Sequence, residues 1–289
     1  MKKIRVIINP ISGSGRQKKA EYSIRKHLNA QFFESEILYS EYAGHLSVLA
    51  QEAANKNYDA VVVVGGDGSV NEATQALTGT KTALGIIPIG SGNGLARFLK
   101  IPMNSTKAVH RINLFERKQI DTADINAHKF VNLAGVGFDA HVAKQFELSH
   151  QRGFRNYAKI SLREFFKYRE QDYTISLDGK LINTKAFMIV FANSNQFGNN
   201  FVIAPQAKID DAMLDVCIIK KPKLYQIPIV LLKIMRKKVH TSHLVIIHKA
   251  SEISIDLHKT TIVNKDGEAL EQDKQLRIKV NPLSLSVII

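Results

Sequence analysis

An apolar run that ends in glycines and one carboxylate is the strongest chemical signal in this 289-residue chain. The residues 61–64 are all valine, and Gly65, Gly66, Asp67 and Gly68 follow directly. Consecutive β-branched residues favour a strand buried on both faces of a parallel sheet. Glycine lets a ligand approach the main chain closely. A carboxylate after such a strand is poorly placed for stability but well placed to hold a metal–phosphate complex.

Two more glycine-rich segments follow predicted strands. Residues 9–16 read Asn-Pro-Ile-Ser-Gly-Ser-Gly-Arg, and residues 88–97 read Pro-Ile-Gly-Ser-Gly-Asn-Gly-Leu-Ala-Arg. The first is neither a Walker A loop nor a dinucleotide fingerprint, because it lacks the Gly-Lys-Ser/Thr ending and a third glycine. After parallel strands, the three loops would converge on one sheet edge and offer amide donors to a polyphosphate. A plain tight turn remains the alternative for the first loop taken alone.

The elements around these loops predict two domains. Strands at 3–9, 32–39, 60–64 and 83–88 alternate with helices at 17–29, 45–56, 70–77 and 95–99, which predicts a doubly wound parallel sheet. Short runs follow at 129–132, 172–178, 186–192, 214–219, 244–248, 251–257 and 276–280, several with period-2 alternation. They predict an antiparallel sheet or sandwich with a helical insertion at 143–169 and a helical piece after Pro222. We therefore expect an α/β domain at 1–120 and a β-rich domain at 121–289, with ligands in the cleft between them.

Composition limits the partners and the location. The net charge is +14 and the pI is about 9.7, which indicates an anionic partner such as nucleic acid, a phosphate substrate or an anionic membrane surface. Zinc-finger spacing, an RNP-like aromatic motif and a lysine-rich tail are all missing, which argues against nucleic acid. No apolar run reaches the roughly 18 residues of a membrane span. The basic start lacks a cleavage site for a signal peptide, and the single cysteine, Cys217, fits a cytoplasmic protein with a buried thiol.

Two basic stretches carry apolar residues as well. They cover residues 152–167 and 221–238. Either could lie on an anionic membrane. Either could equally place its apolar face in the core and its charges in water, so both interpretations stay open.

Taken together, the motifs resemble the diacylglycerol kinase catalytic-domain family, which includes bacterial soluble lipid kinases and has sphingosine and ceramide kinases as relatives. The similar segments are Asn-Pro-x-Ser-Gly at 9–13, Gly-Gly-Asp-Gly-Ser at 65–69 and Pro-x-Gly-Ser-Gly-Asn at 88–93. The second half adds Asn-x-x-Gly-x-Gly-x-Asp at 132–139, Ala-Pro-x-Ala-x-x-Asp-Asp-x-x-Leu-Asp at 204–215 and Asp-Gly-Glu at 266–268. The resemblance implies an NAD kinase/diacylglycerol kinase-like fold that uses ATP and Mg²⁺.

The resemblance also implies a role for each matching position. Asp67 would organise the catalytic magnesium with Asp121 in its support network, and Glu268 would be the general base. A structural magnesium would be bound by the Asp211 side chain and by the backbone carbonyls of Lys208 and Met213, although the acidic turn could simply be solvated. The positions similar to ATP contacts are Asn9, Pro10, Ile11, Ser12, Gly13, Ser40, Gly66, Asp67, Gly68, Ser69, Val70, Asn71, Glu72 and Ser91.

The function implied is an ATP- and Mg-dependent lipid kinase that converts diacylglycerol to phosphatidic acid in phospholipid biosynthesis. The enzyme would be cytoplasmic and peripheral to an anionic membrane, would not bind nucleic acid, and could form a homodimer. The chain departs from the family at Gly94, where diacylglycerol kinases commonly have Asp, and at Ala212, where Gly is frequent. A sphingoid-base or ceramide kinase, an NAD kinase and a non-catalytic lipid or nucleotide sensor therefore remain alternatives.

Overall fold

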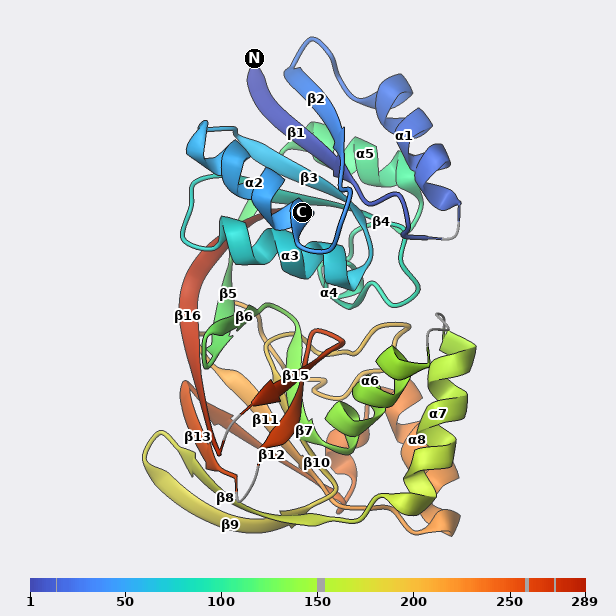
Figure 1. The fold of residues 1–289 in the computed structure, drawn as a ribbon, viewed down its shortest axis with the longest axis vertical. Coiled ribbons are helices and arrows are strands. Elements are labelled where there is room, and N and C mark those ends of the chain that lie inside the picture. Colours follow the sequence, from blue (N-terminus) through green and yellow to red (C-terminus); the bar gives the residue numbers. More distant parts are fainter. Residues whose placement is uncertain (14, 150–153, 258–259, 273) are drawn as a thin grey trace. The chain divides into compact units, whose positions relative to one another are not determined.

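The computed structural model describes residues 1–13, 15–149, 154–257, 260–272 and 274–289 (Figure 1). The chain divides into two compact units, Met1–Thr122 with Pro282–Ile289, and Ala123–Asn281. The predicted boundary at residue 120 lies close to this division. The prediction kept all of 121–289 in the second domain, whereas strand β16 (Gln275–Ile288) carries the last residues back into the first unit.

Parallel strands form the sheet of the first unit, which confirms the predicted α/β architecture. The strand order is β2-β1-β3-β4. The strands are β1 (Lys2–Ile8), β2 (Phe33–Tyr39), β3 (Ala60–Gly65) and β4 (Ala83–Pro88). Every residue of β3 is buried, as its unbroken apolar run predicts. The register pairs Ile8 with Val64 and Gly65 with Pro88, so β1, β3 and β4 end at the same edge.

Helices connect these strands and cover the sheet. They are α1 (Arg16–His27), α2 (His45–Asn55), α3 (Asp67–Leu77), α4 (Gly94–Phe98) and α5 (Ser105–Leu114). Helix α1 packs against α5 and α2 packs against α3, and Figure 1 shows the two pairs on opposite faces of the sheet. Helix α5 was not predicted from the sequence, although Asn104 caps it by accepting the amide N–H of Lys107. Helix α3 begins at Asp67 rather than at residue 70, so the predicted metal-organising carboxylate lies in the first helical turn.

Two antiparallel sheets make up the second unit and confirm the predicted β-rich domain. One has the order β12-β11-β10-β7-β14-β15, and the other contains β16-β13-β8-β9, with β5 paired to β16 and β6 paired to β5. Their strands are β5 (Arg117–Ile125), β6 (His128–Phe130), β7 (Leu133–Gly137), β8 (Gln171–Leu177), β9 (Lys180–Ala186), β10 (Met188–Ala192), β11 (Leu214–Ile219), β12 (Val245–Ala250), β13 (Glu252–Asp256), β14 (Thr261–Lys265) and β15 (Glu268–Gln272). Strands β5, β7, β9, β14 and β15 were not predicted.

The core of the second unit lies between its sheets. Phe191 and Val216 from one sheet pack with Ile175 and Ile255 from the other, so the unit is a sandwich. Helices α6 (Phe138–Leu148), α7 (Phe154–Lys167) and α8 (Ile227–Met235) flank it, with the short turns η1 (Leu224–Gln226) and η2 (Val239–Thr241) around α8. Among the residues the structure describes, no helix has the length and apolar character needed to cross a bilayer.

Candidate active site

Asp67 joins the second glycine loop to the third. It is the first residue of α3, which follows β3 through Gly66. Its Oδ2 atom accepts the amide N–H of Asn93 at 2.8 Å, and its Oδ1 atom accepts the amide N–H of Gly94 at 2.7 Å. The half-buried carboxylate therefore fixes the third loop.

The surroundings of Asp67 set its electrostatics. Burial raises the pKa of the Asp67 carboxyl above its ordinary value, while the amide hydrogen bonds from Gly94 and Asn93 and the charge of Arg97 oppose this effect. Arg97 lies on α4 and donates from Nε to the carbonyl oxygen of Gly92 at 2.9 Å. Arg97 was not predicted as a site residue, although a cation one turn after a glycine loop is a usable signal. A bound cation would stabilise the ionised form of the carboxyl.

Two glycines allow the second and third loops to touch through their backbones. A Cβ atom on Gly90 would lie 2.5 Å from the Cα atom of Gly66 and 2.7 Å from Oδ1 of Asn93. A Cβ atom on Gly66 would lie 3.1 Å from the Cα atom of Gly90. Any side chain at position 90 would push the loops apart, so this glycine serves a close approach rather than a turn alone.

The first loop meets the other two. Asn9 accepts the amide of Ile11 at 3.1 Å through Oδ1 and donates through Nδ2 to the Oγ atom of Ser69 at 2.9 Å. Arg16 donates through Nη2 to the carbonyl oxygen of Gly90 at 3.3 Å. A Cβ atom on Gly13 would lie 2.7 Å from the carbonyl oxygen of Ile89. The three loops thus gather at the edge where β1, β3 and β4 end.

The start of α3 is suited to bind an anion. Gly66 occupies the N-cap position and provides no side chain to cap the helix, so the first-turn amides are not satisfied by a capping group. Ser69 and Asn71 are buried in that helix. The Oε2 atom of Glu72 is buried and has no hydrogen-bond partner among the described residues. A cation bound with a polyphosphate would satisfy such an oxygen, so these residues fit the group that the family resemblance implies.

The remaining positions predicted to contact ATP lie around the same strand ends. Pro10 and Ile11 are exposed, and Ile11 is 91% exposed. Ser40 follows β2 directly, and its amide donates to the carbonyl oxygen of Ile8 at 3.0 Å. Ser91 is exposed in the third loop. Exposed loop residues at this edge are accessible to a ligand.

Asp121 is fully buried on β5 in the first unit. Its Oδ1 atom accepts the amide N–H of Leu283 at 2.7 Å, which ties β5 to the returning strand β16. This contact is structural. The predicted role of Asp121 in the support network of Asp67 stays a prediction.

Glu268 follows a tight hairpin turn in the second unit. Asp266 and Gly267 have φ values of 49° and 94°, as a two-residue turn between β14 and β15 requires. The turn pairs Lys265 with Glu268, and their Nζ and Oε2 atoms lie 3.4 Å apart. The side chain of Glu268 is 47% exposed whereas that of Lys265 is 7% exposed. The predicted base is therefore accessible and is held by an almost buried cation.

Asp266 fixes this turn to the segment before β7. Its carboxylate accepts the amides of Val131 at 3.0 Å, Asn132 at 3.0 Å and Leu133 at 2.9 Å. Two of the motifs that carry the family resemblance, 132–139 and 266–268, are thus brought together.

A second contact joins strand β14, which precedes the 266–268 motif, to the 132–139 motif. The Nδ2 atom of Asn264 donates to Oδ2 of the buried Asp139 at 2.7 Å. Burial raises the pKa of Asp139 to about 6, and the hydrogen bond from Asn264 opposes the shift. A Cβ atom on Gly135 would lie 2.8 Å from that Oδ2 atom, which explains the glycine.

The predicted structural metal site already holds a positive charge. The Nζ atom of Lys249 donates to Oδ2 of Asp211 and lies 3.9 Å from Oδ1 of Asp215. The buried Oδ2 atom of Asp215 has no hydrogen-bond partner among the described residues. Ala212 adopts a left-handed φ of 60°, a conformation that glycine takes at lower cost than alanine. In the described part of the chain, no three His, Cys, Asp or Glu side chains form a metal cluster. Asp211 therefore fits a divalent cation only when Lys249 moves away.

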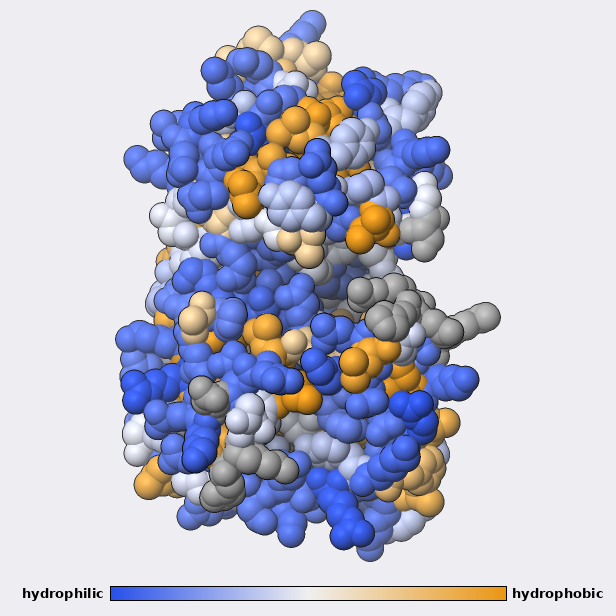
Figure 2. Space-filling model, viewed as in Figure 1, coloured by the Kyte–Doolittle hydropathy of each residue, from blue (hydrophilic) through white to orange (hydrophobic). Residues whose placement is uncertain are grey.

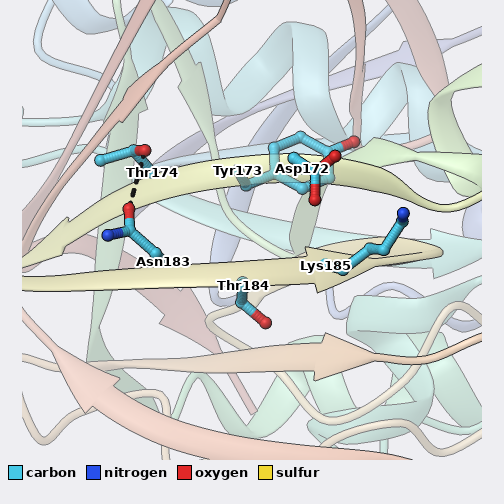
Figure 3. A pocket seen from close by; sticks show the side chains of 6 residues that line it. All are labelled: Asp172, Tyr173, Thr174, Asn183, Thr184 and Lys185. Atoms are coloured by element: carbon cyan, nitrogen blue, oxygen red, sulfur yellow. Dashed lines mark hydrogen bonds between the residues drawn. The ribbon is translucent and has the colours of Figure 1, made fainter.

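A hollow over the hairpin of β8 and β9 contains none of the predicted site residues (Figure 3). It is lined by Asp172, Tyr173, Thr174, Asn183, Thr184 and Lys185. Thr174 donates to Asn183 across the strand pair at 2.9 Å. The side chains come from paired strands, and the hollow lacks the glycine loops and helix start found at the first-unit site.

Comparison with known proteins identifies both halves of the chain. Residues 3–125 match the model of the diacylglycerol kinase catalytic domain, and residues 132–289 match that of the YegS C-terminal NAD kinase beta sandwich-like domain. A diacylglycerol kinase of Bacillus subtilis (strain 168) is 27% identical over 274 residues, which cover 93% of this chain and 90% of the relative. A diacylglycerol kinase of Staphylococcus aureus (strain MRSA252) is 28% identical over 272 residues, which cover 92% of this chain and 86% of the relative.

Solved structures agree with this assignment. A crystal structure from Bacillus anthracis str. Sterne matches with a TM-score of 0.82 and 26% identity, over 99% of this chain and 95% of that chain. A second structure from the same organism, described as a diacylglycerol kinase, matches with a TM-score of 0.76 and 24% identity, over 99% of this chain and 96% of that chain, and supports the fold. With both domain models matched in order and three glycine loops gathered at one edge of the sheet, the chain belongs to the diacylglycerol kinase catalytic-domain family.

Proposed function

We propose that this protein is an ATP- and Mg-dependent lipid kinase that phosphorylates a lipid hydroxyl, with diacylglycerol as the substrate and phosphatidic acid as the product. One observation carries the proposal: the Asp67 carboxylate is held by two backbone amides where the glycine loops meet. Relatives named diacylglycerol kinase, similar over most of the chain, support the choice of substrate.

The residues of the first unit would bind and orient ATP. The amides of the glycine loops and of the first turn of α3 would bind its phosphates. Asp67 would hold the catalytic magnesium, and Asp121 would support that site from β5. When bound, Mg²⁺ would supply charge neutralisation to the transferred phosphoryl group.

Glu268 would act on the acceptor. The lipid hydroxyl oxygen forms a bond to the γ-phosphorus of ATP while the bond from that phosphorus to the β–γ bridging oxygen breaks, and ADP leaves. Glu268 would take the hydroxyl proton as general base, and its side chain is accessible, being 47% exposed. Lys265 would keep the carboxylate in place through their 3.4 Å ion pair.

A structural magnesium, held by Asp211 and by the carbonyl oxygens of Lys208 and Met213, is also part of the proposal. The unpartnered oxygen of Asp215 supports it, and the ion pair between Asp211 and Lys249 opposes it. We place the enzyme in the cytoplasm and at the surface of anionic membranes, because its net charge is +14 and its substrate is a lipid.

The test is phosphorylation of a total lipid extract with labelled ATP and Mg²⁺, followed by identification of the labelled lipid. We expect labelled phosphatidic acid with the wild type and at least about 100-fold less with Asp67→Asn or Glu268→Gln, because each change removes a charge used in the transfer. Asp172→Asn, an exposed carboxylate of the β8 hairpin, is the matched control and should keep full turnover. If a sphingoid base or ceramide is labelled instead, that lipid is the substrate and the assignment to diacylglycerol is wrong. Phosphorylation of NAD but of no lipid would overturn the proposal, and binding without turnover would indicate a sensor.

A further inference from the structure

Helix α8 has apolar residues on almost all of its faces, yet most of its side chains are exposed to solvent. Its sequence, Ile-Pro-Ile-Val-Leu-Leu-Lys-Ile-Met, has Lys233 as its one charged residue. Helices of this composition are normally buried. Here only Ile234 is buried, whereas Ile229 is 56% exposed, Leu232 46% exposed and Met235 71% exposed. Exposed aliphatic residues at this density indicate a surface that something else covers.

The apolar surface continues from α8 to the end of α7. Leu224 and Tyr225 of η1 are 61% and 68% exposed, and Phe166 of α7 is 61% exposed. Leu224 and Phe166 line one hollow of about 320 Å³, so the two segments adjoin. Figure 2 shows hydrophobic residues at the edge of the second unit where α7 and α8 lie. We call these residues the α8 surface: Phe166, Leu224, Tyr225, Ile229, Leu232 and Met235.

Positive charge surrounds the α8 surface. The chain has no acidic residue between Asp215 and Glu252. The cations in that interval that flank α8 are Lys220, Lys221, Lys223, Lys233, Arg236, Lys237 and Lys238. Arg236, Lys237 and Lys238 are exposed directly after the helix. The α8 surface therefore combines an apolar centre with a cationic rim.

We infer that the α8 surface docks on an anionic lipid bilayer. Aliphatic and aromatic side chains would enter the boundary between headgroups and acyl chains, and the flanking cations would lie at the anionic headgroups. A second copy of the chain is a poorer occupant, since it would bring the same positive charges together without an acidic counterpart. Nucleic acid would pair with the cations but would leave the aliphatic side chains in water.

The inference rests on the proposed function only in that a lipid kinase must reach a membrane, and vesicle binding is measured without turnover. The full-length protein is sedimented with phosphatidylcholine vesicles and with vesicles that also contain phosphatidylglycerol. We expect binding to the anionic vesicles alone, and weaker binding as salt rises. Lys237→Gln with Lys238→Gln should weaken it more than about tenfold, because each such charge contributes about fivefold near an anionic surface.

The β9 strand offers matched controls in the same unit. Lys180 and Lys185 are exposed lysines, and Leu181 is 70% exposed, almost the same as Met235. Lys180→Gln with Lys185→Gln removes the same charge, and Leu181→Ser removes a comparable side chain. Met235→Ser should weaken vesicle binding by about fivefold or more, whereas both control variants should bind like the wild type.

A fluorescence probe reports which face enters the lipid. The chain contains no tryptophan, so Tyr225→Trp introduces a single reporter and Leu181→Trp its control. Anionic vesicles should shift the emission of Tyr225→Trp to the blue and leave that of Leu181→Trp unchanged. Equal vesicle binding by the two lysine double variants, or equal shifts of the two reporters, would overturn the inference. So would a wild-type dimer in sedimentation equilibrium that Met235→Ser dissociates.

Different experimental results would refute the proposed lipid kinase activity and the docking of the α8 surface on a membrane. Vesicle binding by a protein that phosphorylates no lipid would refute the proposed function and leave the α8 surface in place. Full turnover of a dispersed short-chain diacylglycerol by Lys237→Gln with Lys238→Gln is expected if the surface serves docking alone. Loss of turnover on that dispersed substrate would place these lysines in catalysis and overturn the docking role.

Discussion

Replacing Asp67 separates its contribution to the fold from its contribution to phosphoryl transfer. The carboxylate accepts two amide hydrogen bonds, at 2.8 Å and 2.7 Å. A hydrogen bond to a charged group contributes roughly 1.5–3 kcal/mol, and the half-buried position favours the lower value, so Asp67→Ala should cost about 3 kcal/mol. Asp67→Asn keeps one acceptor oxygen and should cost about half of that. These losses correspond to Tm decreases of about 6–12 °C and about 3–6 °C.

The two variants should differ in Tm but lose turnover to the same extent. Both variants lose the charge that would hold the catalytic magnesium, so each should lower kcat by at least about 100-fold, equivalent to about 3 kcal/mol. Melting temperature and kcat are measured on the same preparations. Asp178→Asn is the control, because that carboxylate also accepts two amides, from Ser251 at 3.1 Å and Glu252 at 2.8 Å, in the second unit. If Asp67→Asn keeps more than a tenth of wild-type turnover, the carboxylate serves mainly to hold the third loop, and the catalytic role is wrong.

Three further predictions concern the second unit. Burial raises the pKa of Asp139 from 3.8 to about 6, so the folded state binds the proton more tightly and wild-type stability should fall by about 2 kcal/mol as pH rises from 4 to 6; Tm against pH checks this, and the same slope in Asp139→Asn would contradict it. Asp211→Ala should lower Tm and abolish any increase in Tm that Mg²⁺ produces. A wild-type Tm that is the same with and without Mg²⁺ would exclude the structural metal. Lys265→Met should lower kcat about fivefold with little change in the KM for ATP, because the half-exposed ion pair with Glu268 contributes about 1 kcal/mol; an unchanged kcat in steady-state assays would refute this positioning role.

The sequence predicted the first unit well because its signals are local. The unbroken valine run before Gly65 reports burial on both faces, and alternating strands and helices favour parallel pairing. Parallel pairing then brings the loop after each strand to one edge, and the contacts of Asn9 with Ser69 and of Asp67 with Asn93 occur there. Helix α5 was missed although its sequence carries two local signals, the capping Asn104 and the apolar residues Ala108, Val109 and Ile112 that lie on its buried face.

The strands of the second unit were harder to predict, because their extent depends on contacts between residues far apart in the sequence. The Asp-Gly pair at 266–267 is a strong hairpin signal. The residues on either side of it were interpreted as part of the family motif, so the two strands that they form were not predicted. Strand β16 is longer than its predicted core at 276–280, because it continues into the first unit to pair with β4 and to donate an amide to Asp121. A strand's extent depends on the partners available to it, and these lie far away in the sequence.

The sequence by itself determined the family, the fold class and the positions that could carry chemistry. These follow from glycines, apolar periodicity and carboxylates whose spacing can be seen among neighbouring residues. Only the tertiary structure decided the environment of each group. It paired Lys249 with Asp211 across 38 residues, placed an almost buried lysine beside Glu268, and left α8 exposed where the sequence allowed either core or membrane. Burial, ion pairing and pKa depend on atoms that folding brings within a few ångströms, and local sequence does not specify which atoms those are.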